Sequence, residues 1–150
     1  MAQVDFYHLT QSDLETALIM LVKKTIAVGK TALILSPKPL ASTLDAALWA
    51  HDAGSWIPHG VDDAEGVEVA KVWISTDPAS NPLKAPFLFL LQGQVPASWD
   101  GFERVFNLFD GRSEMQVNEA RAQWKTWNGN AALTLSHYAQ SEDGRWQKKV

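Results

Sequence analysis

The chain has 150 residues, of which 46 % are apolar, and its formal net charge is −4 at pH 7. This length suits one compact domain with its own core over residues 1–150, and the negative charge argues against a broad surface for nucleic acid. The chain has no cysteine, which excludes disulfides and thiolate metal sites.

The first part of the chain is predicted to be a strand, a helix and a second strand. Residues 4–9 form the first strand, and Ser12 with Glu15 has the form of a capping box at the start of a helix. Apolar side chains then recur at the helical period as far as Gly29, a typical C-terminal stop. Residues 31–35 are nearly all apolar, as in a strand covered on both faces. This succession predicts a βαβ unit with a right-handed crossover.

The middle of the chain continues with one helix and several strands. After a loop at 36–39, apolar residues at helical spacing predict a second helix that ends near Trp49. Strands are expected at 67–74, where apolar residues alternate, at 87–91, which is wholly apolar, and at 104–109.

The last part of the chain is predicted to hold one more helix. A second capping box, Ser113 with Gln116, opens this helix, which should end near residues 128–129. Residues 131–136 are then a last strand or an extended strap, and the polar tail from about residue 140 is expected to be frayed. The whole pattern predicts a single α/β domain of Rossmann-like outline, with a mostly parallel central sheet flanked by helices.

We expect a cytoplasmic location with no membrane contact. The first residues lack the basic and apolar regions of a secretory signal. The longest apolar run, residues 86–91, has the length of a strand and not of a membrane span.

The sequence favours a protein with no catalytic residues, cofactor or metal of its own. Gly29-Lys30-Thr31 resembles the end of a phosphate-binding loop, but it follows a helix and opens a strand, which reverses the required order. The four histidines lack the spacing of a zinc site. The alternative is a small Rossmann-like enzyme, with its active site at the C-terminal strand ends near Ser36 and residues 75–77.

Candidate binding residues lie on the predicted last helix. Val117 and Trp124 belong to the face that should pack on the sheet, and Arg121 and Lys125 flank this face four residues apart. An arginine fork, a lysine charge and an indole together suit a peptide end that carries a carboxylate. The same spacing also occurs on ordinary solvated helix flanks. Residues 111–150 carry six Lys/Arg against four Asp/Glu, which favours a local anionic partner.

A second candidate surface surrounds two tryptophans that lie on either side of Gly54. Trp49 closes the second helix, and Trp56 opens the extended segment Trp-Ile-Pro, which includes Ile57 and Pro58. Two indoles so close together either fill a core or present an aromatic patch to another protein.

The segment Leu-Asp-Ala-Ala-Leu-Trp at 44–49, followed by Ser-Trp-Ile-Pro-His at 55–59, resembles the signature of the chi subunit of bacterial DNA polymerase III. The family pattern can be laid along the chain from about residue 6 to about residue 135. The resemblance implies a Rossmann-like fold and a non-catalytic accessory role in DNA replication at the fork.

The resemblance also implies two partners. One is the acidic and hydrophobic C-terminal tail of the single-stranded-DNA-binding protein, because the family's Arg-x-x-aromatic-Lys pattern falls on Arg121, Trp124 and Lys125, with Val117 one turn earlier where the family often has a basic residue. The other is the psi subunit, which connects to the clamp loader.

For psi, the resemblance makes Trp56, Ile57 and Pro58 the contact residues and Trp49 a half-buried anchor. Direct binding of single-stranded DNA is disfavoured, because the charged neighbours of Trp73 and Trp99 are mostly acidic.

Overall fold

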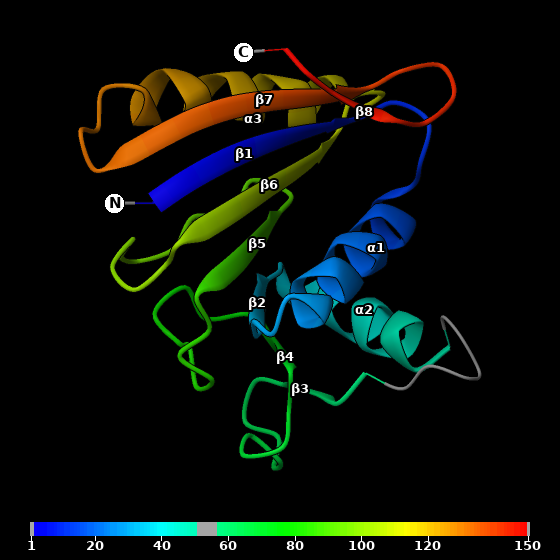
Figure 1. The fold of residues 1–150 in the computed structure, drawn as a ribbon, viewed down its shortest axis with the longest axis vertical. Helices are drawn as coiled ribbons and strands as arrows, with labels where there is room; N and C mark the ends of the chain where they lie inside the picture. The colour runs from blue at the N-terminus through cyan, green and yellow to red at the C-terminus, as the bar shows by residue number, and fades with distance from the viewer. Residues whose placement is uncertain (1, 51–56, 150) are drawn as a thin grey trace.

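An open sheet of eight strands forms the frame of the protein in the computed structural model, which describes residues 2–50 and 57–149 (Figure 1). The elements in chain order are β1 (Ala2–Leu9), α1 (Leu14–Ala27), β2 (Ala32–Leu35), α2 (Lys38–Ala50), β3 (His59–Val61), β4 (Val72–Ser75), β5 (Phe87–Leu91), β6 (Arg104–Asp110), α3 (Glu114–Trp127), β7 (Leu133–Gln140) and β8 (Trp146–Lys148).

The strands lie in the order β3-β4-β2-β5-β6-β1-β7-β8. Every neighbouring pair is parallel except the terminal hairpin of β7 and β8. The α/β fold with a mostly parallel, Rossmann-like sheet is therefore confirmed. The elements β1, α1 and β2 follow one another as predicted, but β1 and β2 are not adjacent in the sheet, because β5 and β6 lie between them.

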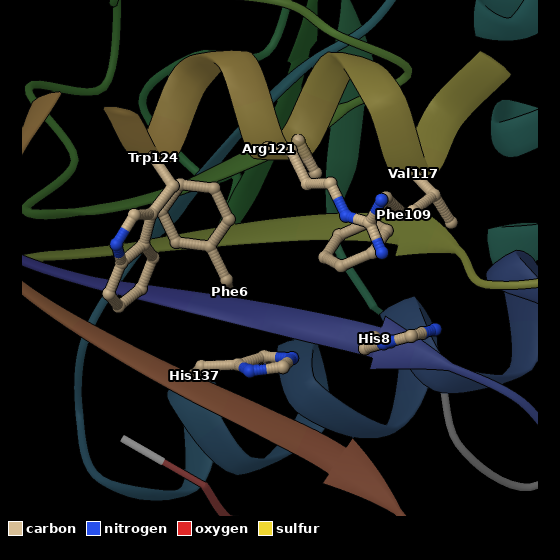
Figure 2. A pocket seen from close by; sticks show the side chains of 8 residues that line it. Phe6, His8, Phe109, Val117, Arg121, Trp124 and His137 are labelled. Carbon is tan, nitrogen blue, oxygen red and sulfur yellow. The ribbon is translucent and has the colours of Figure 1, made fainter. Parts of the chain in front are cut away.

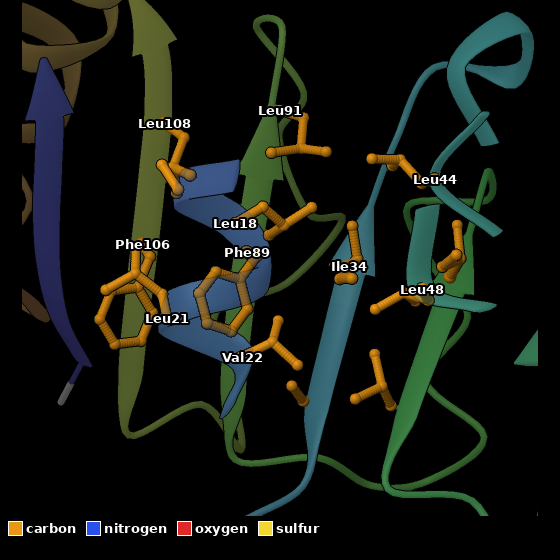
Figure 3. Packing of buried hydrophobic residues seen from close by; sticks show 14 of the residues in the cluster. Leu18, Leu21, Val22, Ile34, Leu44, Leu48, Phe89, Leu91, Phe106 and Leu108 are labelled. Carbon is orange, nitrogen blue, oxygen red and sulfur yellow. The ribbon is translucent and has the colours of Figure 1, made fainter. Parts of the chain in front are cut away.

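The helices α1 and α2 cover one face of the sheet (Figure 3). Leu18, Leu21 and Val22 of α1 point at Phe89 and Phe106, whose rings stack with their centroids 4.6 Å apart. Leu44 and Leu48 of α2 extend the same layer. These side chains are buried because the apolar stripes recur at the helical period and face strands whose inward positions are also apolar.

The helix α3 covers the opposite face, at the end of the sheet that holds β6, β1 and β7 (Figure 1). Ala120 and Trp127 are buried there, and Val117 and Trp124 are partly buried. The predicted packing face of this helix is thus confirmed.

The start of α1 differs from the prediction. Asp13, and not Ser12, is the N-cap, and its Oδ1 accepts a hydrogen bond from the Thr16 N–H at 2.7 Å. Ser12 instead accepts from Gln140 Nε2 at 2.9 Å through its hydroxyl. The Ser12 hydroxyl is thus engaged by the distant Gln140, and Asp13, which is also of a residue type favoured at N-caps, holds the cap position.

The start of α3 follows the prediction in part. Ser113 is the N-cap and accepts from the Gln116 N–H at 3.3 Å. The Gln116 side chain does not return to the cap, as a capping box requires. Its Oε1 accepts from the Asp110 N–H at 2.9 Å, which joins α3 to the end of β6.

Two further predictions are corrected. Of the strand expected at 67–74, only Val72–Ser75 is a strand, while residues 67–69 form a turn and Val69 is 65 % exposed. The segment from residue 140, expected to be a frayed tail, forms the β7–β8 hairpin, in which Gln140 pairs with Trp146.

Candidate functional site

A pocket of about 220 Å³ lies between α3 and the sheet (Figure 2). Its walls are mostly apolar, and its charged or titratable side chains are one guanidinium and two imidazoles. The lining residues are Phe6, His8, Phe109, Val117, Ala120, Arg121, Trp124 and His137.

Three parallel strands supply the floor of the pocket. Phe6 of β1 is opposite His137 of β7, and His8 of β1 is opposite Phe109 of β6. Because side chains alternate between the two faces of a strand, these four residues project from the same face of the sheet. The pocket floor therefore depends on strand register, and not on any local motif.

The helix α3 supplies the roof. Val117, Arg121 and Trp124 are spaced by four and three residues, so they lie on one side of the helix. Trp124 meets the ring of Phe6 edge-on, with centroids 5.1 Å apart. Arg121 is exposed at the mouth, and Figure 2 shows its side chain reaching from α3 toward Phe109. The pocket thus has a cation at its mouth and aromatic walls inside.

The two imidazoles of the floor lie side by side. The rings of His8 and His137 are stacked at 5.9 Å with an interplanar angle of 17°. Burial and then the Arg121 charge lower the pKa of His8, while Asp110 opposes this shift. Burial, then His8 and Lys149, lower the pKa of His137. Both shifts favour neutral imidazoles at neutral pH.

The residues predicted on α3 are brought together only in part. Val117, Arg121 and Trp124 line the pocket, whereas Lys125 is exposed and is not one of the lining residues. Sequence reasoning missed Phe6, His8, Phe109 and His137. The available pattern was the alternation along residues 4–9, but their partners on β6 and β7 are about 100 and 130 residues away.

The second predicted surface is partly described. Trp49 is 59 % exposed at the end of α2, and its ring lies 4.9 Å from that of His59. Ile57 is 3 % exposed and belongs to the core under α2, so its side chain cannot be a surface contact in this structure. Pro58 is half-buried, and Trp56 lies outside the described residues.

The indole of Trp49 packs against the imidazole of His59, which two polar contacts hold in place. His59 Nε2 lies 2.8 Å from Asp45 Oδ1, and its Nδ1 lies 2.8 Å from the Ile57 carbonyl oxygen. These contacts hold the imidazole from both sides. Trp49 is therefore an exposed side chain on a supported base, rather than the half-buried anchor that the sequence predicted.

The strand ends proposed as an alternative active site hold their hydroxyl groups in local hydrogen bonds. Ser36 Oγ donates to the Pro37 carbonyl at 2.8 Å, and Ser75 Oγ donates to the Asp77 carbonyl at 2.9 Å. The Thr76 N–H and hydroxyl both donate to the Asp62 carboxylate. Such bonds shape loops and leave these hydroxyls engaged.

Within the described residues, the chain has neither a cluster of metal-binding side chains nor a helix suited to a bilayer. No three His, Cys, Asp or Glu side chains of residues 2–50 and 57–149 come together as a possible metal site. In the same part of the chain, no helix combines the length and apolarity needed to cross a bilayer.

The fold thus defines an α/β protein of the Rossmann-like class, with a pocket of mixed apolar and cationic character under its last helix. The family model of the DNA polymerase III chi subunit, HolC, matches residues 1–133, and the chain therefore belongs to this family. The resemblance seen in the sequence is confirmed, and with it a role as an accessory subunit of DNA polymerase III in DNA replication. No match was found among curated proteins.

Proposed function

We propose that this chain links the clamp-loader assembly, through a psi-type partner, to the C-terminal tail of the single-stranded-DNA-binding protein. The observation that carries the proposal is the pocket under α3, which combines an exposed guanidinium with apolar walls. The membership in the chi family supplies the replication context.

The pocket suits the end of an acidic peptide better than a small metabolite. Its volume of about 220 Å³ lies below the range of roughly 300–1,000 Å³ that is usual for small-molecule and cofactor sites. One large apolar side chain can pack between Phe6, Phe109 and Trp124, while a carboxylate meets Arg121 at the mouth. A peptide whose last residue is apolar offers both groups next to each other.

The surface around Trp49 supports binding of the psi partner. Exposed tryptophans on a rigid base are typical anchors of protein interfaces. Trp49 has this character because the ring of His59 supports it, and Pro58 lies beside the same strand end. Ile57 contributes to this surface from below, as part of the core that fixes its shape.

The two surfaces belong to different ends of the sheet. The pocket lies over β1, β6 and β7, whereas Trp49 lies near β3 at the far edge, with β4, β2 and β5 between. Both partners can therefore bind one molecule at once. Two contacts held on one body raise the effective concentration of each partner, so each affinity can be modest.

The substitution Arg121→Ala tests the tail-binding part of the proposal. We expect it to weaken binding of an acidic peptide ending in Phe by at least about tenfold, because a charge-assisted contact contributes on the order of 1.5–3 kcal/mol. Isothermal titration at low salt measures the effect. Higher salt should weaken the wild-type interaction, because the contact is partly exposed.

Lys125→Ala is the matched control, since Lys125 lies one turn further along the same helix but outside the pocket lining. It should change the affinity by less than about threefold, as expected for an exposed charge. Equal effects of the two substitutions, or an unchanged affinity of Arg121→Ala, would contradict the assignment of the pocket.

A further inference from the structure

The floor of the pocket holds a polar atom that the fold does not satisfy. His137 Nε2 is buried and has no hydrogen-bond partner among residues 2–50 and 57–149. Buried polar atoms without a partner are rare, and each one invites an explanation. Because His137 lines the pocket, a shift of its ring on binding would bring this buried atom to a bound molecule.

The charged groups that act on the two histidines come from three neighbouring segments. Arg121 lies above them on α3, Asp110 lies at the end of β6, and Lys149 follows β8. Figure 2 shows the imidazole of His137 extending along the sheet toward that of His8. Burial, and after it Arg121 beside His8 and Lys149 beside His137, lower the pKa values of the two rings and so favour their neutral forms.

The backbone also fixes the position of His8. Gly111, in the turn between β6 and α3, approaches so closely that a Cβ atom there would lie 2.0 Å from His8 Nε2. The Gly111 N–H is itself held by the Leu9 carbonyl at 2.7 Å. Only glycine permits this approach. The turn therefore closes against the ring and limits the space into which His8 could move.

We propose that the carboxylate of a bound peptide accepts a hydrogen bond from His137 Nε2, and that binding draws one proton from solvent onto the His8–His137 pair. This inference rests on the proposed function, because its ligand is the same acidic peptide. Arg121 supplies the charge at the mouth, and His137 supplies a second donor deeper between the apolar walls.

Proton uptake is expected because the bound carboxylate changes the charge in the pocket. An anion held beside a neutral imidazole favours the protonated form and so raises its pKa. Two adjacent imidazolium ions would repel each other, so the pair takes up a single proton. Affinity then rises as pH falls through the pKa of the occupied pocket, by at most about tenfold per pH unit for one proton.

The test measures binding of an acetylated peptide that carries several aspartates and ends in Phe. Acetylation removes the amine that would otherwise titrate near neutrality, and aspartates titrate well below pH 6. Titration calorimetry at pH 6 and pH 8, in two buffers of different ionisation enthalpy, gives both the affinity and the proton uptake. We expect wild-type binding to be about fivefold tighter at pH 6 than at pH 8, with net proton uptake.

Three variants distinguish the hydrogen bond from His137 from the uptake of a proton by the His8–His137 pair. The double substitution H8Q/H137Q removes both titrating groups and should abolish proton uptake. H137Q alone keeps a donor and should bind within about threefold of wild type at pH 8, whereas H137L removes the donor and should bind more weakly. H59Q, on the opposite edge of the sheet, is the matched control and should keep the wild-type pH dependence.

Several outcomes would overturn the inference. They are pH-independent binding by the wild type, wild-type pH dependence in H8Q/H137Q, or equal affinities of H137L and H137Q. If the peptide binds and Arg121→Ala weakens it while any of these results holds, only this inference fails. If the wild type does not bind the peptide at all, the proposed function fails with it.

Discussion

The two candidate surfaces differ in shape and in how the fold builds them. The pocket under α3 is a hollow whose walls come from α3, β1, β6 and β7, with a cation at its mouth. The surface at α2 and β3 presents one exposed indole, that of Trp49, on a fixed support. A hollow receives the end of another chain, whereas an exposed indole enters a pocket on its partner. The difference predicts that the partner inserts a side chain at the pocket under α3, whereas this protein inserts Trp49 into its partner at the second surface.

The two regions also depend on the rest of the fold to different degrees. The pocket needs the register of three strands that are far apart in sequence. The Trp49 surface is built from α2 and β3, which follow each other in the chain, with the Trp49 ring against that of His59. We therefore expect the pocket to respond to substitutions at the β7–β8 edge, and the Trp49 surface to be indifferent to them.

The largest expected effect comes from Gln140→Ala. Gln140 is 9 % exposed, and its Oε1 accepts from the N–H groups of Thr10, Gln11 and Ser12 at 3.0–3.1 Å. Loss of these bonds should lower the free energy of unfolding by about 2–3 kcal/mol, as measured by urea denaturation.

The comparison becomes sharper if Gln140→Ala also weakens peptide binding while psi binding stays intact. Thr134→Ala, at an exposed position of the same strand, is the control, and it should change stability by no more than about 0.5 kcal/mol. A loss of psi binding in Gln140→Ala would show that the two regions are not independent.

The next effect is that of Trp49→Ala on psi binding. Truncation of an exposed aromatic anchor should cost about 2 kcal/mol, or roughly thirtyfold in affinity, with stability and peptide binding unchanged. Surface plasmon resonance with immobilised psi measures this loss. Met115→Ala removes an exposed apolar side chain elsewhere and should have no effect. Full psi binding by Trp49→Ala would remove Trp49 from the interface.

The smallest effect is a pH dependence of stability that originates in the pocket. The pKa values of His8 and His137 are lowered in the folded state, mainly by burial. The unfolded chain therefore binds protons first as pH falls below about 6.5, and folding stability decreases from there down to the folded-state pKa values. Urea denaturation at pH 7, 6 and 5 should show a shallower decrease in H8Q/H137Q than in the wild type.

The carboxylates of Asp13 and Asp110 affect stability in a separate, lower pH range. Hydrogen bonds from Thr16 and Arg112 lower the pKa values of Asp13 and Asp110, respectively. Their contribution is present above the unfolded-state value near 3.9 and is lost as pH falls further. If the free energy of unfolding changes with pH equally in the wild type and in H8Q/H137Q between pH 7 and 5, His8 and His137 do not contribute to the pH dependence predicted for them.

Local patterns in the sequence determined the elements and one side of the candidate site. Apolar spacing was sufficient for α1, α2 and α3, and continuous apolar runs were sufficient for β2 and β5. The placement of Arg121 and Trp124 on one side of a helix also follows from spacing alone. These features could be predicted because they depend on residues within a few positions of each other.

Only the tertiary structure decided the strand order, the pocket floor and the burial of Ile57. Phe6 and His137 share the floor because β1 and β7 pair, although more than a hundred residues separate them. Ser12 lost its expected role as a cap because its hydroxyl meets the side chain of Gln140. Strand pairing is a competition among all segments of the chain for the same hydrogen bonds and core volume. That competition is settled by long-range packing, which no local pattern records.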